Sequence, residues 1–347
     1  ILDPDAQTAA GFEAQRQGDL AARTAAFAGA QAEARTADSK HVEVVAHLAT
    51  AAEAQVALQA GAEGVGLLRT EFIFQERTEP PGEEEQYAVY RQVAEAMAGR
   101  PVVIRTLDIG GDKLVAHLQI LKEDNPQLGW RAVRFCLARP DIFKTQLRAM
   151  LRASVHGAIA IMFPMISGIE ELRKVKAVVQ EVMSELDAAA ISYNKDIKIG
   201  SMIEVPSAVM LADLLAQETD FFSIGTNDLI QYLLAVDRVN EKIAHLYDPA
   251  HPAVIRMIHQ TAQAARVRKI PCSICGEMAG DALYTELLLG LGITSLSMAA
   301  VAIPVIRAEI SHINLEEART LARKALKMRT DDEIRVLLAG RHHVRAD

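Results

Sequence analysis

The hydrophobic positions from residue 41 onward fall into short β-branched runs, and longer amphipathic stretches separate these runs. Short buried runs are typical of strands in parallel sheets, whereas amphipathic stretches are typical of helices. The runs predict strands over residues 41–49, 64–71, 102–109, 159–165, 198–205, 221–229, 271–278 and 295–300. The amphipathic stretches predict helices over residues 83–98, 142–153, 169–189, 208–217, 253–268 and 283–289.

This alternation of strand and helix predicts an α/β fold with a parallel sheet. About eight repeats favour a closed (β/α)8 barrel, the TIM barrel, over an open doubly wound sheet. The Gly-rich phosphate fingerprint GxGxxG, which follows the first strand of many doubly wound sheets, does not follow residues 41–49. An open sheet is the alternative that the pattern leaves.

The first part of the chain has a different texture. Residues 6–39 are rich in Ala, Gln, Glu and Arg and contain almost no large apolar side chains. Such a segment can form helix but cannot bury much of a core. We therefore predict a helical linker over residues 1–40, followed by a TIM barrel over residues 41–340.

Composition narrows the class of protein. The 347 residues contain no uninterrupted apolar run of the ~18 residues that cross a bilayer, so no membrane span is predicted. A net charge of −8 argues against a nucleic-acid surface. Three cysteines in a chain of this length, without a recognisable secretory signal, indicate a reducing cytoplasm.

Charged residues gather at the outgoing ends of the predicted strands, which is where TIM-barrel enzymes hold their chemistry. Four arginines belong to different outgoing segments: Arg69, Arg105, Arg131 and Arg238. Planar guanidinium groups bind phosphate and carboxylate with two hydrogen bonds, so the four predict a site for a multiply charged anion. The alternative is that each arginine pairs with a nearby acid, such as Glu71 or Asp108.

Two carboxylates end consecutive predicted strands, Glu204 and Asp228, and Asn227 lies beside the second. Oxygen ligands of this kind suit a hard cation that keeps several waters for substrate oxygens, so Mg²⁺ or Mn²⁺ is expected rather than Zn²⁺. Next to an anion cluster, they imply a metal that bridges protein and phosphate. The alternative is that the two acids only neutralise the arginines.

Cys275 ends a further predicted strand. An unperturbed thiol, with a pKa of ~8.5, is protonated at neutral pH and can donate a proton to a carbon acid. A small buried apolar residue is the alternative role for Cys275. Cys272 and Cys275 form a C-x-x-C pattern, but residues three apart on a strand face opposite ways, which argues against a shared metal ion.

Seven motifs resemble, in order and spacing, those of the C-terminal domain of enzyme I of the phosphoenolpyruvate:sugar phosphotransferase system. They are GVGLLRTEFIF, VVIRTLDIGGDK, DNPQLGWRA, IMFPMI, IEVPSA, FFSIGTNDLIQYLLAVDR and CSICGEMAGD. The resemblance covers roughly residues 41–310. Pyruvate phosphate dikinase and phosphoenolpyruvate synthase have a related barrel, but GLLRTEFIF followed by the acidic residues 83–85 is more similar to enzyme I.

The resemblance implies a phosphotransferase that moves the phosphoryl group of phosphoenolpyruvate to a protein histidine and releases pyruvate, the first step of the sugar phosphotransferase system. It also implies a role for each matched residue. Phosphoenolpyruvate would be bound by Arg69, Arg105, Arg131, Asn227 and Arg238. Glu204 and Asp228 would ligate Mg²⁺, and Cys275 would protonate the departing enolate at carbon.

The same resemblance implies partners. In the family, the phosphorylated histidine lies in a Gly-rich Ser-His segment of an N-terminal domain, which passes the phosphate to the carrier protein HPr. No histidine of this sequence has that setting, so we expect the acceptor to lie outside this chain. Family members dimerise through the barrel domain, so a cytoplasmic homodimer is expected.

Two other functions compete with this one. A non-catalytic sensor of phosphoenolpyruvate would need no proton donor, so Cys275 favours an enzyme. A magnesium-dependent lyase of the aldolase type would need a pyruvate-enolate site but no phosphate clamp, so the four arginines speak against it.

Overall fold

The strands form a closed barrel in the computed structural model, which describes residues 5, 13, 32–75, 77–110 and 123–345 of the chain. Neighbouring strands are parallel and follow one another in chain order, and the last strand returns to pair with the first. They are β1 Glu43–Leu48, β2 Val65–Leu68, β3 Val102–Arg105, β4 Ile159–Phe163, β5 Lys198–Ile203, β6 Phe221–Gly225, β7 Cys272–Cys275 and β8 Ser295–Met298. The predicted α/β (β/α)8 TIM barrel is confirmed.

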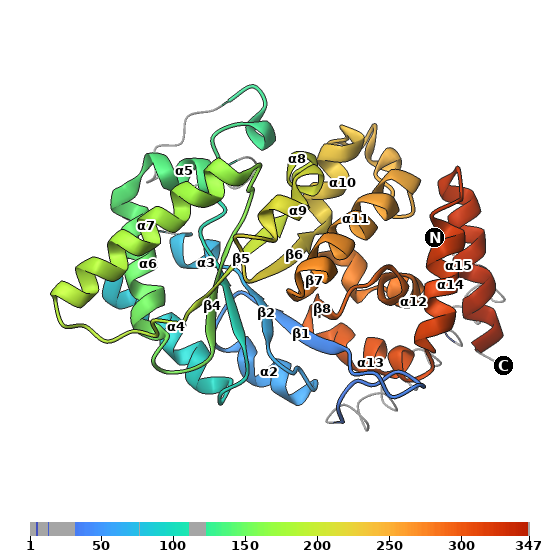
Figure 1. Ribbon diagram of the computed structural model, residues 1–347, viewed down its shortest axis with the longest axis horizontal. Coiled ribbons are helices and arrows are strands. Elements are labelled where there is room, and N and C mark those ends of the chain that lie inside the picture. The colour runs from blue at the N-terminus through green and yellow to red at the C-terminus, as the bar shows by residue number, and fades with distance from the viewer. Residues whose placement is uncertain (1–4, 6–12, 14–31, 76, 111–122, 346–347) are drawn as a thin grey trace.

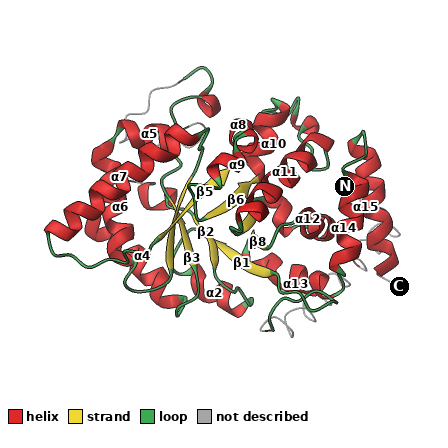
Figure 2. Ribbon diagram, viewed as in Figure 1, coloured by secondary structure: helices red, strands yellow, loops and turns green. Residues whose placement is uncertain are grey.

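Helices surround this barrel, as Figure 2 shows. They are α2 Glu53–Gln59, α3 Glu71–Phe74, α4 Glu83–Ala96, α5 Val133–Ala138, α6 Pro140–Ala153, α7 Ile169–Ala188, α8 Pro206–Met210, α9 Ala212–Leu215, α10 Thr226–Leu234, α11 Pro252–Arg268, α12 Ala282–Leu291, α13 Ile303–Ser311, α14 Leu315–Ala325 and α15 Asp331–Arg345. In Figure 1 the strands lie at the centre, α4, α6 and α7 lie on one side, and α14 and α15 lie on the opposite side, outside α12.

Helix α6 illustrates how local sequence sets these elements. Pro140 opens it, where the missing N–H costs nothing because the first helical amides have no partner within the helix. Phe143, Leu147 and Met150 are buried at spacings of three and four, which places them on one face of the helix. That face packs against α4 and β4, so the amphipathic period fixes the side that faces the barrel.

The core has two layers, because side chains alternate between the two faces of each strand. Val102 and Ile104 of β3 point outward into the large cluster between strands and helices. A small second cluster of Leu67, Met162, Met202 and Cys275 fills the barrel interior. This interior cluster lies directly beneath the outgoing ends of the strands.

Every predicted strand is present but shorter than predicted, and all lose residues at the outgoing end. In residues 221–229 a helix replaces the end of the predicted strand, because the strand stops at Gly225 and α10 begins at Thr226. Asn227 and Asp228 therefore lie in the first turn of a helix and not at the end of a strand. The predicted helix over residues 208–217 is two short helices, α8 and α9, which meet at Leu211.

The predicted helical linker over residues 1–40 lies mostly outside the described residues. Of its described part, residues 32–40 are not helical, and Arg35 forms an antiparallel bridge with His41 across a turn. At the other end, α15 runs past the predicted boundary at residue 340, and Arg341 pairs with Glu286 of α12 at 2.7 Å. None of the helices in the described ranges is long and apolar enough to cross a membrane.

Candidate active site

The outgoing ends of the strands surround a cavity of about 160 Å³. All eight residues that the sequence singled out line it, and they end or follow the five strands β2, β3, β5, β6 and β7: Arg69, Arg105, Arg131, Glu204, Asn227, Asp228, Arg238 and Cys275. Asp108, Met202 and Gly276 complete much of the wall. The predicted residues are therefore brought together at the face of the barrel where the fold predicts chemistry.

Arg105, the last residue of β3, is buried and paired. Its Nη2 donates to Oε1 of Glu71 at 2.8 Å, and its Nη1 lies 3.0 Å from Oδ2 of Asp108. Burial alone would lower the pKa of Arg105, but the charges of Glu71 and Asp108 more than offset this and raise it. Arg105 is charged, and two carboxylates from neighbouring loops hold it in place.

Arg131 has a denser set of partners. Its Nη2 donates to Oδ1 of Asp108 at 2.8 Å and to Oδ2 of Asp228 at 3.0 Å. Its Nη1 donates to Oε1 of Gln127 at 2.5 Å and to the hydroxyl of Tyr232 at 3.0 Å. The four hydrogens on the two terminal nitrogens all have acceptors, so the orientation of the guanidinium plane is fixed.

Asp228 joins two of the predicted arginines. While its Oδ2 accepts from Arg131, its Oδ1 accepts from Nη1 of Arg238 at 2.9 Å. The sequence left open whether the arginines bind an anion or pair with nearby acids. Three of the four, Arg105, Arg131 and Arg238, do pair with acids. For Arg69, no carboxylate within the described ranges lies at ion-pair distance of the guanidinium.

The ion pairs do not use every hydrogen-bond donor of the buried arginines. The Nε atoms of Arg105 and Arg131 are buried, and neither has a hydrogen-bond partner in the described part of the chain. An unsatisfied buried donor on a charged group is costly, and such groups in native proteins call for an explanation. Four arginines and three acids line the cavity, and these unpaired donors are open to an anion.

Glu204 follows β5 and is 2% exposed. Its Oε1 accepts from the backbone amide of Met165 at 2.7 Å. Burial, followed by repulsion from Asp228 and Asp108, raises the pKa of Glu204 to about 8. Gly225 makes room for this carboxyl group, because a Cβ at that position would lie 2.5 Å from Oε2. The mutual repulsion of these acids is the electrostatic setting that a bound cation relieves.

Cys275 is the last residue of β7 and points into the barrel. Its Sγ accepts from the hydroxyl of Ser223 at 3.5 Å, and burial raises the pKa of the thiol to about 11. The thiol is therefore protonated at neutral pH. Cys272 belongs to the outer core cluster, so the two cysteines face opposite sides of the sheet and do not chelate one ion.

Asn227 lies where α10 meets the segment after β7. Its Oδ1 accepts from the backbone amide of Glu277 at 3.2 Å. Gly276 has φ of +103°, and a Cβ there would lie 2.7 Å from the same Oδ1. Gly110 plays a similar part beside Arg131, since an added Cβ would lie 2.6 Å from the Cβ of Arg131. Residues 111–113, the rest of the Gly-Gly-Asp-Lys stretch, lie outside the described residues.

Two contributors were missed as site residues from the sequence. Tyr232 and Gln127 hold Arg131, although neither is charged and neither ends a strand. The spacing of Tyr232, four residues after Asp228 on α10, is a signal that could have found it, because residues four apart share a helix face. For Gln127 no local signal exists, since its role depends on the position of its loop.

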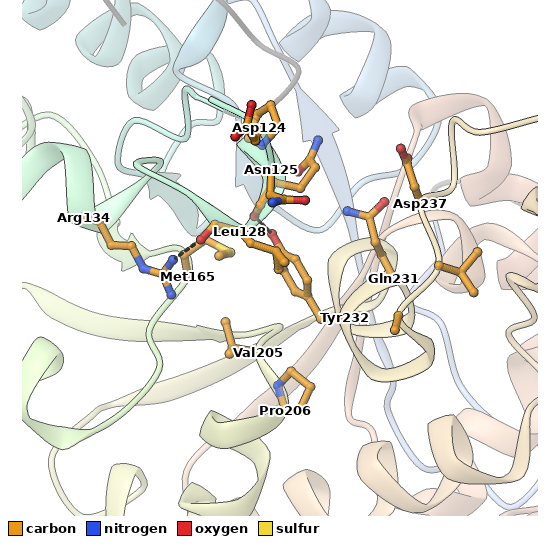
Figure 3. Close-up of a pocket in the computed structure, with 14 residues that line it drawn as sticks. Asp124, Asn125, Leu128, Arg134, Met165, Val205, Pro206, Gln231, Tyr232 and Asp237 are labelled. Carbon is orange, nitrogen blue, oxygen red and sulfur yellow. Dashed lines mark hydrogen bonds between the residues drawn. The ribbon is translucent and has the colours of Figure 1, made fainter. Parts of the chain in front are cut away.

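A second, larger cavity of about 550 Å³ lies beside the first. Figure 3 shows Tyr232 among the residues that line it, together with Leu128, Met165, Gln231 and Asp237. Arg134 donates to the carbonyl groups of Leu128 and Gly129 and so ties the loop at the edge of this cavity to α5. The hydroxyl of Tyr232 accepts from Arg131, which lines the smaller cavity, so this contact links the linings of the two cavities.

Comparison with known proteins places this geometry in a family. A family model described as "PEP-utilising enzyme, PEP-binding domain" matches residues 24–315. The phosphoenolpyruvate-protein phosphotransferase of Haemophilus influenzae is 49% identical over 303 residues, which are 87% of this chain and 53% of that protein. The phosphotransferase of the same name from Priestia megaterium is 43% identical over 345 residues, 99% of this chain and 60% of that protein.

Two further matches differ in kind. The multiphosphoryl transfer protein of Rhodobacter capsulatus is 49% identical over 304 residues, 88% of this chain but only 36% of that protein. A crystal structure of a citrate lyase from Burkholderia xenovorans matches with a TM-score of 0.50 and 15% identity over 88% of this chain and 92% of that one, which shows a shared fold alone. The chain spans about half the length of the curated relatives it matches. The family model and these identities show that the chain belongs to the PEP-utilising enzymes and contains their PEP-binding domain.

Proposed function

We propose that this chain is the phosphoenolpyruvate-binding part of a phosphoenolpyruvate-protein phosphotransferase. It moves the phosphoryl group to a histidine on an N-terminal domain and releases pyruvate, the first step of a sugar phosphotransferase system. One observation carries the proposal: four arginines, two carboxylates and a protonated thiol, from the outgoing ends of five strands, line one small cavity at the outgoing face of the barrel. The names of the relatives support the same activity.

The arginines bind the substrate anion. Phosphoenolpyruvate carries a phosphate and a carboxylate, and guanidinium groups match the geometry of both. Arg69 has no carboxylate partner in the described ranges, and the buried Nε donors of Arg105 and Arg131 are unpaired, so these groups have hydrogen bonds to offer. Arg238 is only partly buried and completes the clamp with the amide of Asn227.

Glu204 and Asp228 fit a hard cation, which we take to be Mg²⁺. Glu204 is buried and repelled by Asp228 and Asp108, and neutralising such a group is what a cation does. Within the described ranges, no group of three or more His, Cys, Asp or Glu side chains gathers for a metal, so further ligands would be water and substrate oxygens. When bound, Mg²⁺ would neutralise charge on the phosphoryl oxygens.

The reaction needs an acceptor and a proton. The bond between phosphorus and the enolate oxygen breaks, a bond from phosphorus to a histidine nitrogen forms, and the enolate carbon takes a proton. Cys275 supplies that proton and becomes a thiolate, which accepts the hydrogen bond of Ser223 until water reprotonates it. No histidine is found among the described residues that line the cavity, so the acceptor comes from outside them. Positioning and electrostatics account for most of the catalysis in such transfers.

The remaining expectations extend the proposal to the whole protein. We propose residues 1–40 as a linker to the histidine-bearing domain, which passes its phosphate to HPr, and residues 41–340 as the phosphoenolpyruvate-binding and dimerisation domain. Exposed apolar side chains near the outgoing face, among them Leu128, Val239 and Leu246, are compatible with a homodimer. The site of action would be the cytoplasm.

Incubation with radiolabelled phosphoenolpyruvate and Mg²⁺ tests the proposal. We expect this chain alone to bind the compound without becoming labelled, and an added N-terminal domain from a relative to become labelled. Transfer should be slow, because two separate proteins lack the high effective concentration of linked domains. Stable label on this chain by itself would contradict the assignment of roles, as would an N-terminal domain that stays unlabelled.

A further inference from the structure

Tyr232 lines the larger cavity of the outgoing face and contacts Arg131, which lines the smaller one. It lies on α10 four residues after Asp228, so both side chains project from one face of the helix. Tyr232 lines the cavity of about 550 Å³ in Figure 3, whereas Asp228 lines the cavity of about 160 Å³. One helix face therefore contributes to both cavities.

The hydroxyl of Tyr232 makes two hydrogen bonds. It accepts from Nη1 of Arg131 at 3.0 Å and donates to the carbonyl oxygen of Gln127 at 2.5 Å. The side chain of Gln127 accepts from the same Nη1 at 2.5 Å. Arg131, Tyr232 and Gln127 thus form a closed triangle, in which each residue contacts the other two.

Asp228 and Tyr232 hold opposite branches of the Arg131 guanidinium. Asp228 accepts from Nη2, as does Asp108, while Tyr232 and Gln127 accept from Nη1. Because a guanidinium is planar and rigid, fixing both branches fixes the direction of the remaining donor, Nε–H. That donor is buried and unpaired among the described residues, and Arg131 lines the smaller cavity.

We propose that Tyr232 is a positioning residue for the substrate anion, which holds Arg131 in the plane required for binding. This inference rests on the proposed function. Burial raises the pKa of Tyr232 to about 12, so its hydroxyl keeps its proton at neutral pH and can donate to Gln127 while accepting from Arg131. Without the hydroxyl, Nη1 keeps only Gln127, and the carbonyl group of Gln127 loses its own hydrogen bond, so this branch of the guanidinium is held less firmly.

The first test measures affinity. Binding of phosphoenolpyruvate in the presence of Mg²⁺ is followed by calorimetry for the unmodified chain, for Tyr232→Phe and for Tyr87→Phe. Tyr87 is a matched control, because its hydroxyl also makes a hydrogen bond, to His156 at 2.8 Å. His156 lies just before β4, at the end of the barrel opposite to the cavities. A hydrogen bond to a charged group predicts about tenfold weaker binding for Tyr232→Phe. Tyr87→Phe should bind like the unmodified chain.

The outcomes separate the two proposals. An unmodified chain that does not bind phosphoenolpyruvate contradicts the proposed function. Equal affinity of Tyr232→Phe and the unmodified chain contradicts the positioning role alone, and leaves the clamp in place. About tenfold weaker binding of Tyr232→Phe, with Tyr87→Phe unchanged, supports it.

A second test asks whether Tyr232 acts through Arg131. The Tyr232→Phe substitution is repeated in an Arg131→Lys chain, which keeps the positive charge but lacks the two-branched geometry. If Tyr232 positions the guanidinium, its removal should cost less than about twofold in affinity in this background. An equal loss in both backgrounds would assign the effect to packing of α10 and would overturn the inference.

Discussion

The charged side chains that line the cavity are mostly buried, and a buried charge is costly unless it is paired. Asp108 is 1% exposed and contacts both Arg105 and Arg131, while Asp228 contacts two arginines. Removing one partner of a buried ion pair leaves an uncompensated charge, which is why such changes are strongly destabilising. Substitutions that remove a neutral group therefore test function more cleanly than substitutions of the paired charges.

Cys275→Ala is such a substitution. The substitution leaves the arginines in place, so binding of phosphoenolpyruvate should stay within about twofold. In the presence of an added N-terminal domain that accepts the phosphoryl group, the rate of pyruvate release should fall about 10²-fold or more, the usual contribution of a general acid. Cys272→Ala is the matched control, because that thiol lies three residues away on the opposite face of β7. Undiminished pyruvate release from Cys275→Ala would leave the thiol a packing role only.

His47 of β1 predicts a pH dependence of stability. Burial, and then the charges of Arg69 and Arg105, lower its pKa from 6.5 to about 3, and its Nε2 is buried without a partner in the described ranges. Between these two pKa values, His47 is therefore protonated in the unfolded chain and neutral in the folded chain. This contribution to stability is complete above the unfolded pKa and is lost as pH falls toward the folded pKa.

Urea unfolding at two pH values can measure this contribution of His47 to the free energy of unfolding. Between about pH 7.5 and pH 5, His47→Asn should lose about 2 kcal/mol less of its unfolding free energy than the unmodified chain does. Only the difference between the two pH values matters, so any change in packing cancels. The same loss in both proteins would mean that His47 becomes protonated in the folded state.

At the scale of elements, the site depends on how strands pass into the next segment. The strand β6 ends at Gly225 and β7 is followed by Gly276, and each glycine leaves space for a neighbouring side chain that lines the cavity. Gly276 has φ of +103° and ψ of −174°, a region that essentially only glycine occupies. A Cβ would also lie 2.3 Å from Oγ1 of Thr226, whose hydroxyl donates to the carbonyl of Cys275 at 2.8 Å.

Gly276→Ala should therefore destabilise the fold by about 2 kcal/mol or more and weaken binding of phosphoenolpyruvate, because Asn227 must move. Gly340→Ala is the control, since no atom lies within 4 Å of its added Cβ on the exposed face of α15. That change should raise stability by about 0.5–1 kcal/mol, the helix-propensity difference. Thermal unfolding reports both values, and equal effects of the two substitutions would contradict the strain at Gly276.

The whole molecule assembles the site by closing the barrel. Arg131 and Asp228 are 97 positions apart, and Arg131 and Tyr232 are 101 positions apart, yet both pairs are in contact. A ligand that bridges several such segments stabilises the folded chain and not the unfolded one, so its binding adds to the unfolding free energy.

Phosphoenolpyruvate and Mg²⁺ together should therefore raise the melting temperature more than either alone. At a ligand concentration of about 100-fold over Kd, the gain is about 2.7 kcal/mol. The extra gain should disappear in Asp228→Asn and persist in Glu218→Gln, a surface acid that pairs with Arg173. An identical gain for the unmodified chain and Asp228→Asn would refute Asp228 as a metal ligand.

The sequence by itself predicted the barrel and the eight candidate residues that line the cavity at its outgoing face. Strand and helix period are local, within about 4 to 20 residues, and the outgoing end of a strand can be located from such a pattern. Hence Arg69, Glu204 and Cys275 could be placed on one face of a (β/α)8 fold before any contact was known. The motifs added the family and the roles that the resemblance implies.

Only the tertiary structure decided which of these residues touch. The pairing of Asp228 with Arg131 and Arg238, the start of α10 at Thr226 and the contact of Tyr232 with Arg131 depend on loops whose positions follow from barrel closure. A local period cannot encode a contact between segments about a hundred residues apart, because nothing in either segment specifies the distance to the other. The physical reason is that closure of the eight strands into a barrel brings the segments after β3 and β6 to the same face.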